Sequence, residues 1–322
     1  MKRMVCALAV LALGASACAA SDPAGKSGKF LIVATVSPVT DIVRNVAGDA
    51  AEVTGIIPEG VDSHTFEPTP ASARILVKAD LVVINGLRLE DPTLALARAN
   101  LKDGAEIFLV GDATVAKDEF IYDFSFPKSE GNPNPHLWVD PANAERYARA
   151  IRDRLVVLDP TNAATYRANT DTFLAVLARL DAAIAVAVET IPPANRVLLT
   201  YHDSFAYFAR HYGMRVIGAI QPADFAQPSA REVAALIAQV KKTKVPAIFG
   251  SEVYPSPVLA QIARESGARY EASLRDDDLP GDPGDPQHSY VGMMVYNVTT
   301  MVNALGGNPE ALADFPTEAQ YD

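Results

Sequence analysis

The sequence predicts an α/β protein in which two lobes, each with a mainly parallel sheet flanked by helices, are joined by one long backbone helix. Short apolar runs alternate with helical patterns from Lys29 onwards, which is typical of α/β architectures. One stretch differs, because no proline or glycine interrupts the chain from Thr161 to Ile191 and apolar residues recur along it at steps of three and four. Such a helix would measure roughly 45 Å, long enough to connect two lobes.

The N-terminus has the pattern of a secretory leader. Lys2 and Arg3 precede an apolar run that ends among small residues and is too short to span a membrane. We therefore predict a signal peptide over residues 1–17 and a tether over residues 18–28. Signal peptidase could use the Ala15-Ser16-Ala17 site, or Cys18 could be lipidated, and we favour lipidation because a cysteine lies at the cut. Both routes predict an extracytoplasmic protein, either periplasmic or anchored to the membrane through Cys18.

Charge and cysteine content limit the function further. The 322 residues carry a formal net charge of −11, and loss of Lys2 and Arg3 with the leader takes it to −13. This negative balance argues against a nucleic-acid partner and suits a cationic cargo. The two cysteines are Cys6, in the predicted signal peptide, and Cys18, at the start of the tether, so we expect no disulfide and no thiolate ligand in the mature fold. No other apolar run reaches the roughly 18 residues that a membrane span needs.

The N-terminal lobe is predicted over residues 29–158. Thr69-Pro70 and Asp140-Pro141 each combine a capping side chain with a proline suited to the first helical turn, and Ser37-Pro38 opens another helix. The predicted helices are 37–47, one that begins at 70, 93–99 and 141–157. The predicted strands are 30–36, 52–57, 81–84 and 107–110, and residues 111–134 are predicted to form a loop.

The long helix is predicted within residues 159–191, where Pro192-Pro193 ends it. The C-terminal lobe follows over residues 192–322. Its predicted strands are 196–200, 214–220, 247–249 and 269–273. Its predicted helices are 204–211, 229–242, 258–266 and one opened by Ser289. An acidic loop rich in glycine and proline precedes the last helix, and the tail beyond Gly306 is polar.

Three of the five histidines, His64, His136 and His202, follow a predicted strand or precede a helix. In open α/β sheets ligands bind beyond the carboxyl ends of the strands, so we expect these histidines in the cleft between the lobes. Neutral imidazoles suit zinc and other late first-row ions, and one carboxylate would complete a tetrahedral shell. We expect that carboxylate from the aspartates at 276–278, with Asp277 as first choice and Asp276 as second.

Three segments of the chain resemble the histidine motifs of the metal-binding solute-binding proteins that serve zinc and manganese ABC importers. They are Asp62-Ser63-His64-Thr65-Phe66-Glu67-Pro68-Thr69-Pro70, Pro135-His136-Leu137-Trp138-Val139-Asp140-Pro141 and Thr200-Tyr201-His202-Asp203-Ser204-Phe205. The resemblance extends from about Phe30 to Gly306. It implies that His64 and His136 face His202 and an aspartate, mapped onto Asp277, and that the partner is an ABC permease. We expect the protein to be a monomer.

The resemblance also bears on the metal. Manganese-type members tend to have a glutamate where this chain has His202, and oxygen-rich sites suit manganese better than nitrogen-rich ones. We therefore expect high-affinity capture of Zn²⁺ as cargo, with Mn²⁺ less favoured. Many zinc-importing relatives carry a histidine-rich loop before the second motif, but residues 111–134 contain no histidine. Glu67, Asp203 and Glu252 are expected to surround the ligands without binding the metal.

Other functions remain open at this point. A manganese-specific binder would share the same fold and three of the same ligands. A secreted zinc hydrolase could use Glu252 as general base, although no His-x-x-x-His helix and no nucleophile elbow occurs in the sequence. A metal-stabilised adhesin is the third alternative. We favour a binding protein over an enzyme.

Overall fold

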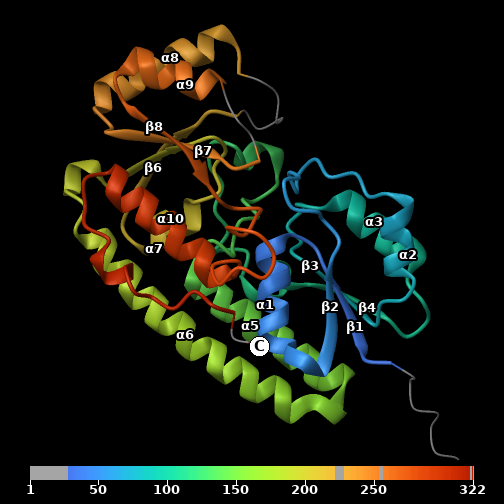
Figure 1. Cartoon of the computed structure of the whole chain (residues 1–322). Helices are drawn as coiled ribbons and strands as arrows, with labels where there is room; N and C mark the ends of the chain where they lie inside the picture. The colour runs from blue at the N-terminus through green and yellow to red at the C-terminus, as the bar shows by residue number, and fades with distance from the viewer. Residues whose placement is uncertain (1–27, 222–227, 254–256, 320, 322) are drawn as a thin grey trace, which may run out of the picture.

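The structure is a computed structural model that describes residues 28–221, 228–253, 257–319 and 321. The predicted signal peptide, Cys18 and nearly all of the predicted tether lie outside the described residues. Parallel strands flanked by helices, together with one long helix, confirm the predicted α/β class (Figure 1). Within the described ranges, no helix is both long and apolar enough to cross a membrane.

The N-terminal part of the chain forms a four-stranded parallel sheet in the order β2-β1-β3-β4. The strands are β1 (Phe30–Ala34), β2 (Ala51–Gly55), β3 (Leu81–Ile84) and β4 (Glu106–Leu109). Helices α1 (Ser37–Ala47) and α5 (Pro141–Leu158) cover one face, and α2 (Pro70–Leu76) and α3 (Asp91–Asn100) cover the other. Successive strand residues point to opposite faces, so Ile32 packs in the first layer and Val33 in the second.

The predicted caps hold these helices in place. The Thr69 side chain accepts a hydrogen bond from the Ser72 amide at the start of α2, and Asp140 accepts one from the Ala142 amide at the start of α5. Ser289 does the same for the Gly292 amide at the start of the last helix. Each bond satisfies a backbone donor that has no partner within its own helix.

The long helix α6 (Ala163–Glu189) lies within the stretch predicted for it and measures roughly 40 Å. Residues 160–162 form a 3₁₀ turn ahead of it. Its buried stripe of Phe173, Leu177, Leu180 and Ile184 shares one hydrophobic cluster with Ile32 of β1 and Phe249 of β7. Figure 1 shows α6 running along both parts of the molecule. The exact lobe boundaries at 158/159 and 191/192 stay a prediction.

The C-terminal strands form two parallel pairs rather than one continuous sheet. β5 (Val197–Thr200) pairs with β6 (Arg215–Ala219), and β7 (Ala247–Ser251) pairs with β8 (Arg269–Leu274), each with one register shift. Helices α8 (Ala230–Thr243) and α9 (Pro257–Ser266) cover one face of these strands. Helix α7 (Ala206–His211) follows β5, and α10 (Tyr290–Ala304) packs against α6.

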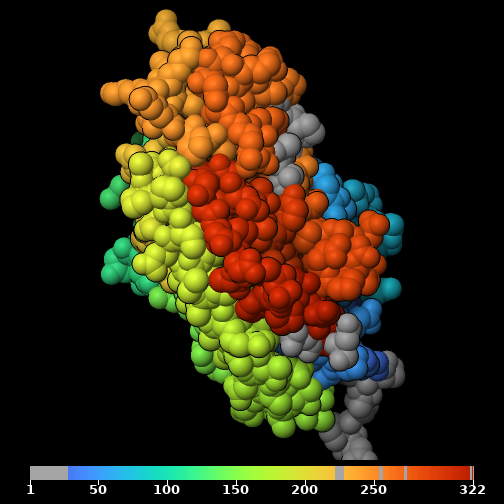
Figure 2. All heavy atoms as spheres, turned by 60° about the vertical axis from the view of Figure 1, so that its left-hand side comes forward, coloured from blue at the N-terminus to red at the C-terminus, as the bar shows by residue number. Residues whose placement is uncertain are grey.

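Two segments differ from the prediction. Part of the predicted loop 111–134 is a short helix, α4 (Val110–Thr114), in which Gly111 fits because a Cβ there would meet the Asn85 carbonyl oxygen at 2.7 Å. The tail is polar in sequence, yet Leu312 is buried and the Tyr321 hydroxyl donates to Asp41 of α1. Figure 2 shows the C-terminal segments, in red, lying beside α6 in the middle of one face.

Candidate metal centre

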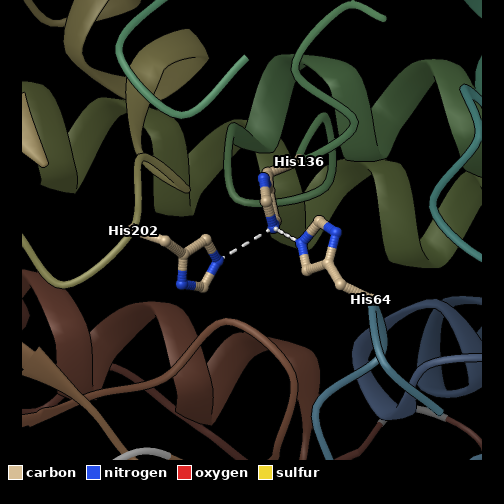
Figure 3. A group of neighbouring side chains, drawn as sticks. All are labelled: His64, His136 and His202. Atoms are coloured by element: carbon tan, nitrogen blue, oxygen red, sulfur yellow. Dashed lines mark hydrogen bonds between the residues drawn. The ribbon is translucent and has the colours of Figure 1, made fainter. Parts of the chain in front are cut away.

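The three predicted histidines converge on one point. The Nε2 atom of His136 lies 3.1 Å from Nε2 of His64 and 3.1 Å from Nε2 of His202. Figure 3 shows the three rings approaching from different segments with these nitrogens turned towards one another. His136 and His202 are buried, and His64 is partly exposed. Of the residues that the structure describes, these form the one group of at least three histidine, cysteine or acidic side chains that could hold a metal ion.

Strand ends and local turns bring these rings together. His64 lies in the loop after β2, and His202 lies two residues beyond the end of β5. The Asp62 side chain accepts hydrogen bonds from the His64 amide at 2.9 Å and the Thr65 hydroxyl at 2.7 Å, which closes a tight turn. His136 lies just before α5, whose Asp140 cap fixes where the helix begins. The loops beyond the carboxyl ends of β2 and β5 thus carry His64 and His202, and the segment before α5 carries His136.

A carboxylate lies next to His202. Asp276 follows the end of β8, and its Oδ2 atom lies 2.8 Å from Nε2 of His202, with both side chains 2% exposed. The same Oδ2 atom is buried without a hydrogen-bond partner among the described residues, apart from this charged contact. The Asp276 carboxylate therefore lies beside one of the three converging imidazoles.

The two neighbouring aspartates have other partners. Asp277 accepts hydrogen bonds from the Ser63 hydroxyl at 2.7 Å and the Ser63 amide at 3.2 Å. Asp278 accepts one from the Gly60 amide at 2.7 Å. All three bonds join the loop after β8 to the loop after β2, so these carboxylates connect the two parts of the chain.

Glu252 organises the aspartate loop. Its Oε1 atom accepts hydrogen bonds from the backbone amides of Asp276, Asp277 and Asp278, each at 3.0 Å. Burial and the negative charge of Asp276 raise its pKa well above the ordinary value. The sequence indicated a role for Glu252 beside the ligands, and the structure brings it to the backbone of the loop that carries Asp276.

Burial and charge divide the three histidines electrostatically. Burial and the charge of His202 lower the pKa of His64 to about 3, and burial lowers the pKa of His136 well below its usual range. Burial also disfavours the charged form of His202, but the Asp276 carboxylate outweighs it and raises the pKa of His202 to about 9. Without metal, the site therefore holds a His202–Asp276 ion pair beside two neutral imidazoles.

The spacing suits a tetrahedral metal shell. With zinc–nitrogen bonds of about 2.0–2.1 Å, neighbouring ligand nitrogens in a tetrahedron lie roughly 3.3 Å apart. Nε2 of His136 lies 3.1 Å from Nε2 of His64 and 3.1 Å from Nε2 of His202. Two of the three nitrogen pairs thus have nearly the separation that a tetrahedral zinc site needs.

The remaining predicted residues differ in position. Glu67 is exposed in the loop before α2. Asp203 is buried, and burial together with the charge of Asp123 raises its pKa well above the ordinary value. Its backbone oxygen accepts a hydrogen bond from the Asn134 side chain.

Sequence reasoning missed Asn134, Asn85 and Ser63. Asn134 Oδ1 lies 2.9 Å from His136 Nδ1, and Asn85 donates to the Pro135 carbonyl at 3.0 Å, so both support the segment that carries His136. Asn134-Pro135 reads as ordinary loop sequence, and Ser63 lay unremarked beside His64. For Asn134 and Ser63 the only available signal was their proximity to the motif histidines, and Asn85 had no such signal.

The fold and site agree with a family comparison. The family model described as "Zinc-uptake complex component A periplasmic" (ZnuA) matches residues 32–304. The chain belongs to the ZnuA family. This confirms the resemblance inferred from the three motifs, and with it an extracytoplasmic, metal-binding component of an ABC importer.

The names of similar proteins refer to different metals. The iron-binding protein YfeA of Yersinia pestis is 29% identical, covering 91% of this chain and 92% of its own. The manganese-binding lipoprotein MntA of Halalkalibacterium halodurans is 29% identical, covering 92% of this chain and 96% of its own. The periplasmic zinc-binding protein TroA of Treponema pallidum has a similar structure, with a TM-score of 0.78 and 28% identity over 86% of this chain and 99% of that one.

Proposed function

We propose that this protein captures one Zn²⁺ ion through His64, His136, His202 and Asp276 and delivers it to the permease of an ABC importer. The observation that carries the proposal is the convergence of three Nε2 atoms, with the Asp276 carboxylate 2.8 Å from one of them. Three nitrogen ligands and one oxygen ligand suit zinc, whereas manganese favours oxygen-rich sites.

Asp276 is proposed as the fourth ligand in preference to Asp277. The Oδ2 atom of Asp276 faces His202 at 2.8 Å, whereas both oxygens of Asp277 accept hydrogen bonds from Ser63. Coordination by Asp277 would break these bonds, which join two segments far apart in the sequence. This choice reverses the order of preference that the sequence suggested.

Zinc and manganese are distinguished by competitive titration of the purified protein, combined with elemental analysis of the protein as isolated. We expect wild type to prefer Zn²⁺ and His202→Glu to shift its preference towards Mn²⁺, because the substitution replaces a nitrogen ligand with an oxygen ligand. A wild-type preference for Mn²⁺ or iron would refute the zinc assignment and leave the transport role intact. Failure to bind any divalent metal would refute the function as a whole.

The contacts of Glu252 favour transport over hydrolysis. A zinc hydrolase would need Glu252 as general base, but its Oε1 atom accepts three backbone hydrogen bonds from the aspartate loop. In this arrangement Glu252 supports a ligand and does not activate water.

We further propose that the mature protein is a monomer anchored through a lipid on Cys18. The support is the position of Cys18 directly after the small residues of the leader. Mass spectrometry of the membrane fraction should find the lipid on wild type, and Cys18→Ala should move the protein to the soluble fraction. A soluble wild-type protein cleaved after Ala17 would contradict the anchor.

A further inference from the structure

Asn134 is a buried amide in which every hydrogen-bonding group has a partner. Its backbone amide donates to the Ile121 carbonyl at 2.9 Å, and its carbonyl accepts from the Tyr207 hydroxyl at 3.0 Å. Its side-chain nitrogen donates to the Asp123 carboxylate at 2.7 Å and to the Asp203 backbone oxygen. Its side-chain oxygen lies 2.9 Å from both the amide and Nδ1 of His136.

These partners leave one orientation for the amide. The Asp123 carboxylate oxygen and the Asp203 backbone oxygen both accept hydrogen bonds, so the atom of Asn134 that faces them must be Nδ2. The opposite end faces the His136 backbone N–H, which can only donate. A flipped amide would set oxygen against two oxygens and nitrogen against a donor.

The fixed amide determines which nitrogen of His136 carries the proton. Because Oδ1 of Asn134 can only accept, the His136 nitrogen facing it, Nδ1, must be protonated. The lone pair of the neutral ring then lies on Nε2, the atom that faces the other two histidines. Such a partner on the distal nitrogen orients a metal-binding imidazole and sets its tautomer.

The other end of the same amide reaches the second part of the site. Asp203 follows His202 directly, and its backbone oxygen is held by Asn134 Nδ2. The Asn134 side chain thus contacts both His136, just before α5, and the segment after β5 that carries His202.

We propose that Asn134 is a positioning residue that selects the metal-binding tautomer of His136 and sets the distance between His136 and His202. This inference rests on the proposed function. The Nδ2 end holds the His202 segment, and the Oδ1 end holds His136 in the form that offers Nε2.

The tautomer is tested on the metal-free protein by ¹⁵N NMR of histidine-labelled full chain, with the His136 signals identified by their loss in His136→Gln. We expect wild-type His136 to be protonated at Nδ1 and Asn134→Ala to give a mixture of tautomers. Protonation of wild-type His136 at Nε2 would overturn the proposal. This readout needs no bound metal, so it is separate from failure of the proposed function.

Two variants separate the two ends of the amide in Zn²⁺ titrations. Asn134→Ala removes both ends and should weaken binding roughly 10- to 100-fold, as loss of an outer partner of a metal ligand does. Asn134→Asp keeps the acceptor for His136 but sets a carboxylate against Asp123 and the Asp203 oxygen. It should keep the wild-type tautomer and still lose affinity.

Asn132→Ala is the matched control, because its side chain accepts from Arg88 near the surface and should leave affinity unchanged. Wild-type affinity in Asn134→Asp would remove the His202 half of the proposal, and wild-type affinity in Asn134→Ala would remove the whole of it. Thermal melting shows whether each variant is folded. If Asn134→Ala does not fold, the tautomer of His136 in the wild-type protein decides the part of the proposal that concerns His136.

Discussion

Trp138 donates a hydrogen bond from Nε1 to the backbone oxygen of Asp276 at 2.8 Å, which ties the segment before α5 to the aspartate loop. The ring centroids of Trp138 and His136 are 5.1 Å apart, and Trp138 is the only tryptophan in the chain. We therefore expect its fluorescence to change in proportion to bound metal. Trp138→Phe should lower the free energy of unfolding by about 1–3 kcal/mol, because a buried oxygen loses its donor. A fluorescence titration and urea unfolding measure both, and emission that stays constant up to one equivalent of Zn²⁺ would contradict the first.

Asp276→Ala should weaken Zn²⁺ binding by more than the roughly 10- to 100-fold that loss of an outer partner costs, because it removes a proposed ligand. Asp277→Ala is the matched control one residue away, and it removes only the bonds to Ser63. We expect its affinity to fall by at most about 10-fold. Isothermal titration with a competing chelator measures both values. A larger loss in Asp277→Ala than in Asp276→Ala would return Asp277 to the ligand set.

Metal binding should release about one proton at pH 7, because the pKa of His202 is raised to about 9 in the metal-free protein and the ring must lose its proton to bind metal. Apparent affinity should then fall about tenfold per unit as pH drops below 9. Calorimetry in two buffers of different ionisation enthalpy counts the protons. Zero release at pH 7 would mean that His202 is neutral before binding.

The free energy of unfolding of the metal-free protein should fall as pH rises, whereas the metal affinity should rise. The folded pKa of His202 lies above the value of about 6.5 for an unfolded chain. Its contribution is therefore fully present below about pH 6.5 and is lost as pH rises through about 9. Urea unfolding of the metal-free protein across this range should show the decline, and His202→Gln should lack it.

Glu252→Ala should destabilise the aspartate loop, because three backbone amides lose their shared acceptor. Each buried donor left without a partner costs about 1–3 kcal/mol. We expect a lower unfolding free energy together with weaker Zn²⁺ binding. Glu252→Gln keeps an acceptor oxygen and should have milder effects on both. Equal effects of the two variants would show that the charge of Glu252 matters more than its hydrogen bonds.

Metal binding should leave the overall shape almost unchanged, because α6 packs into a cluster shared with β1 and β7 and leaves little freedom for a wide hinge. Small-angle scattering profiles with and without Zn²⁺ should superimpose. A clear contraction on adding metal would contradict this and show that the two parts of the molecule rotate towards each other when the metal binds.

The sequence predicted most elements because their signals are local. The predicted helix 37–47 coincides with α1, where a proline in the first turn and an apolar stripe are enough. Helix α4 was missed because it depends on a tertiary contact, the 2.8 Å hydrogen bond from the Gly111 amide to the Asn85 carbonyl. A helix this short has too few internal bonds to be recognised from its own sequence.

The site residues also differ in whether local sequence or tertiary contacts determine their role. The histidine motifs are local, and the structure brings all three rings together. The choice between Asp276 and Asp277 could not be made from three identical neighbours, because it depends on how Glu252 and Ser63 hold the loop. Asn134 could not be recognised because its role arises from contacts with Asp123 and Asp203, which lie 11 and 69 residues away along the chain.

The apolar stripe of α6 gives the molecule a property that two separately folded lobes would not have. Because Leu177 and Leu180 share one cluster with strands from both ends of the chain, neither end can lose its packing without exposing the other. The protein should therefore melt in a single cooperative transition. An ion bound where the two ends meet would then raise the melting temperature of the entire chain, by an amount that grows with metal concentration relative to Kd.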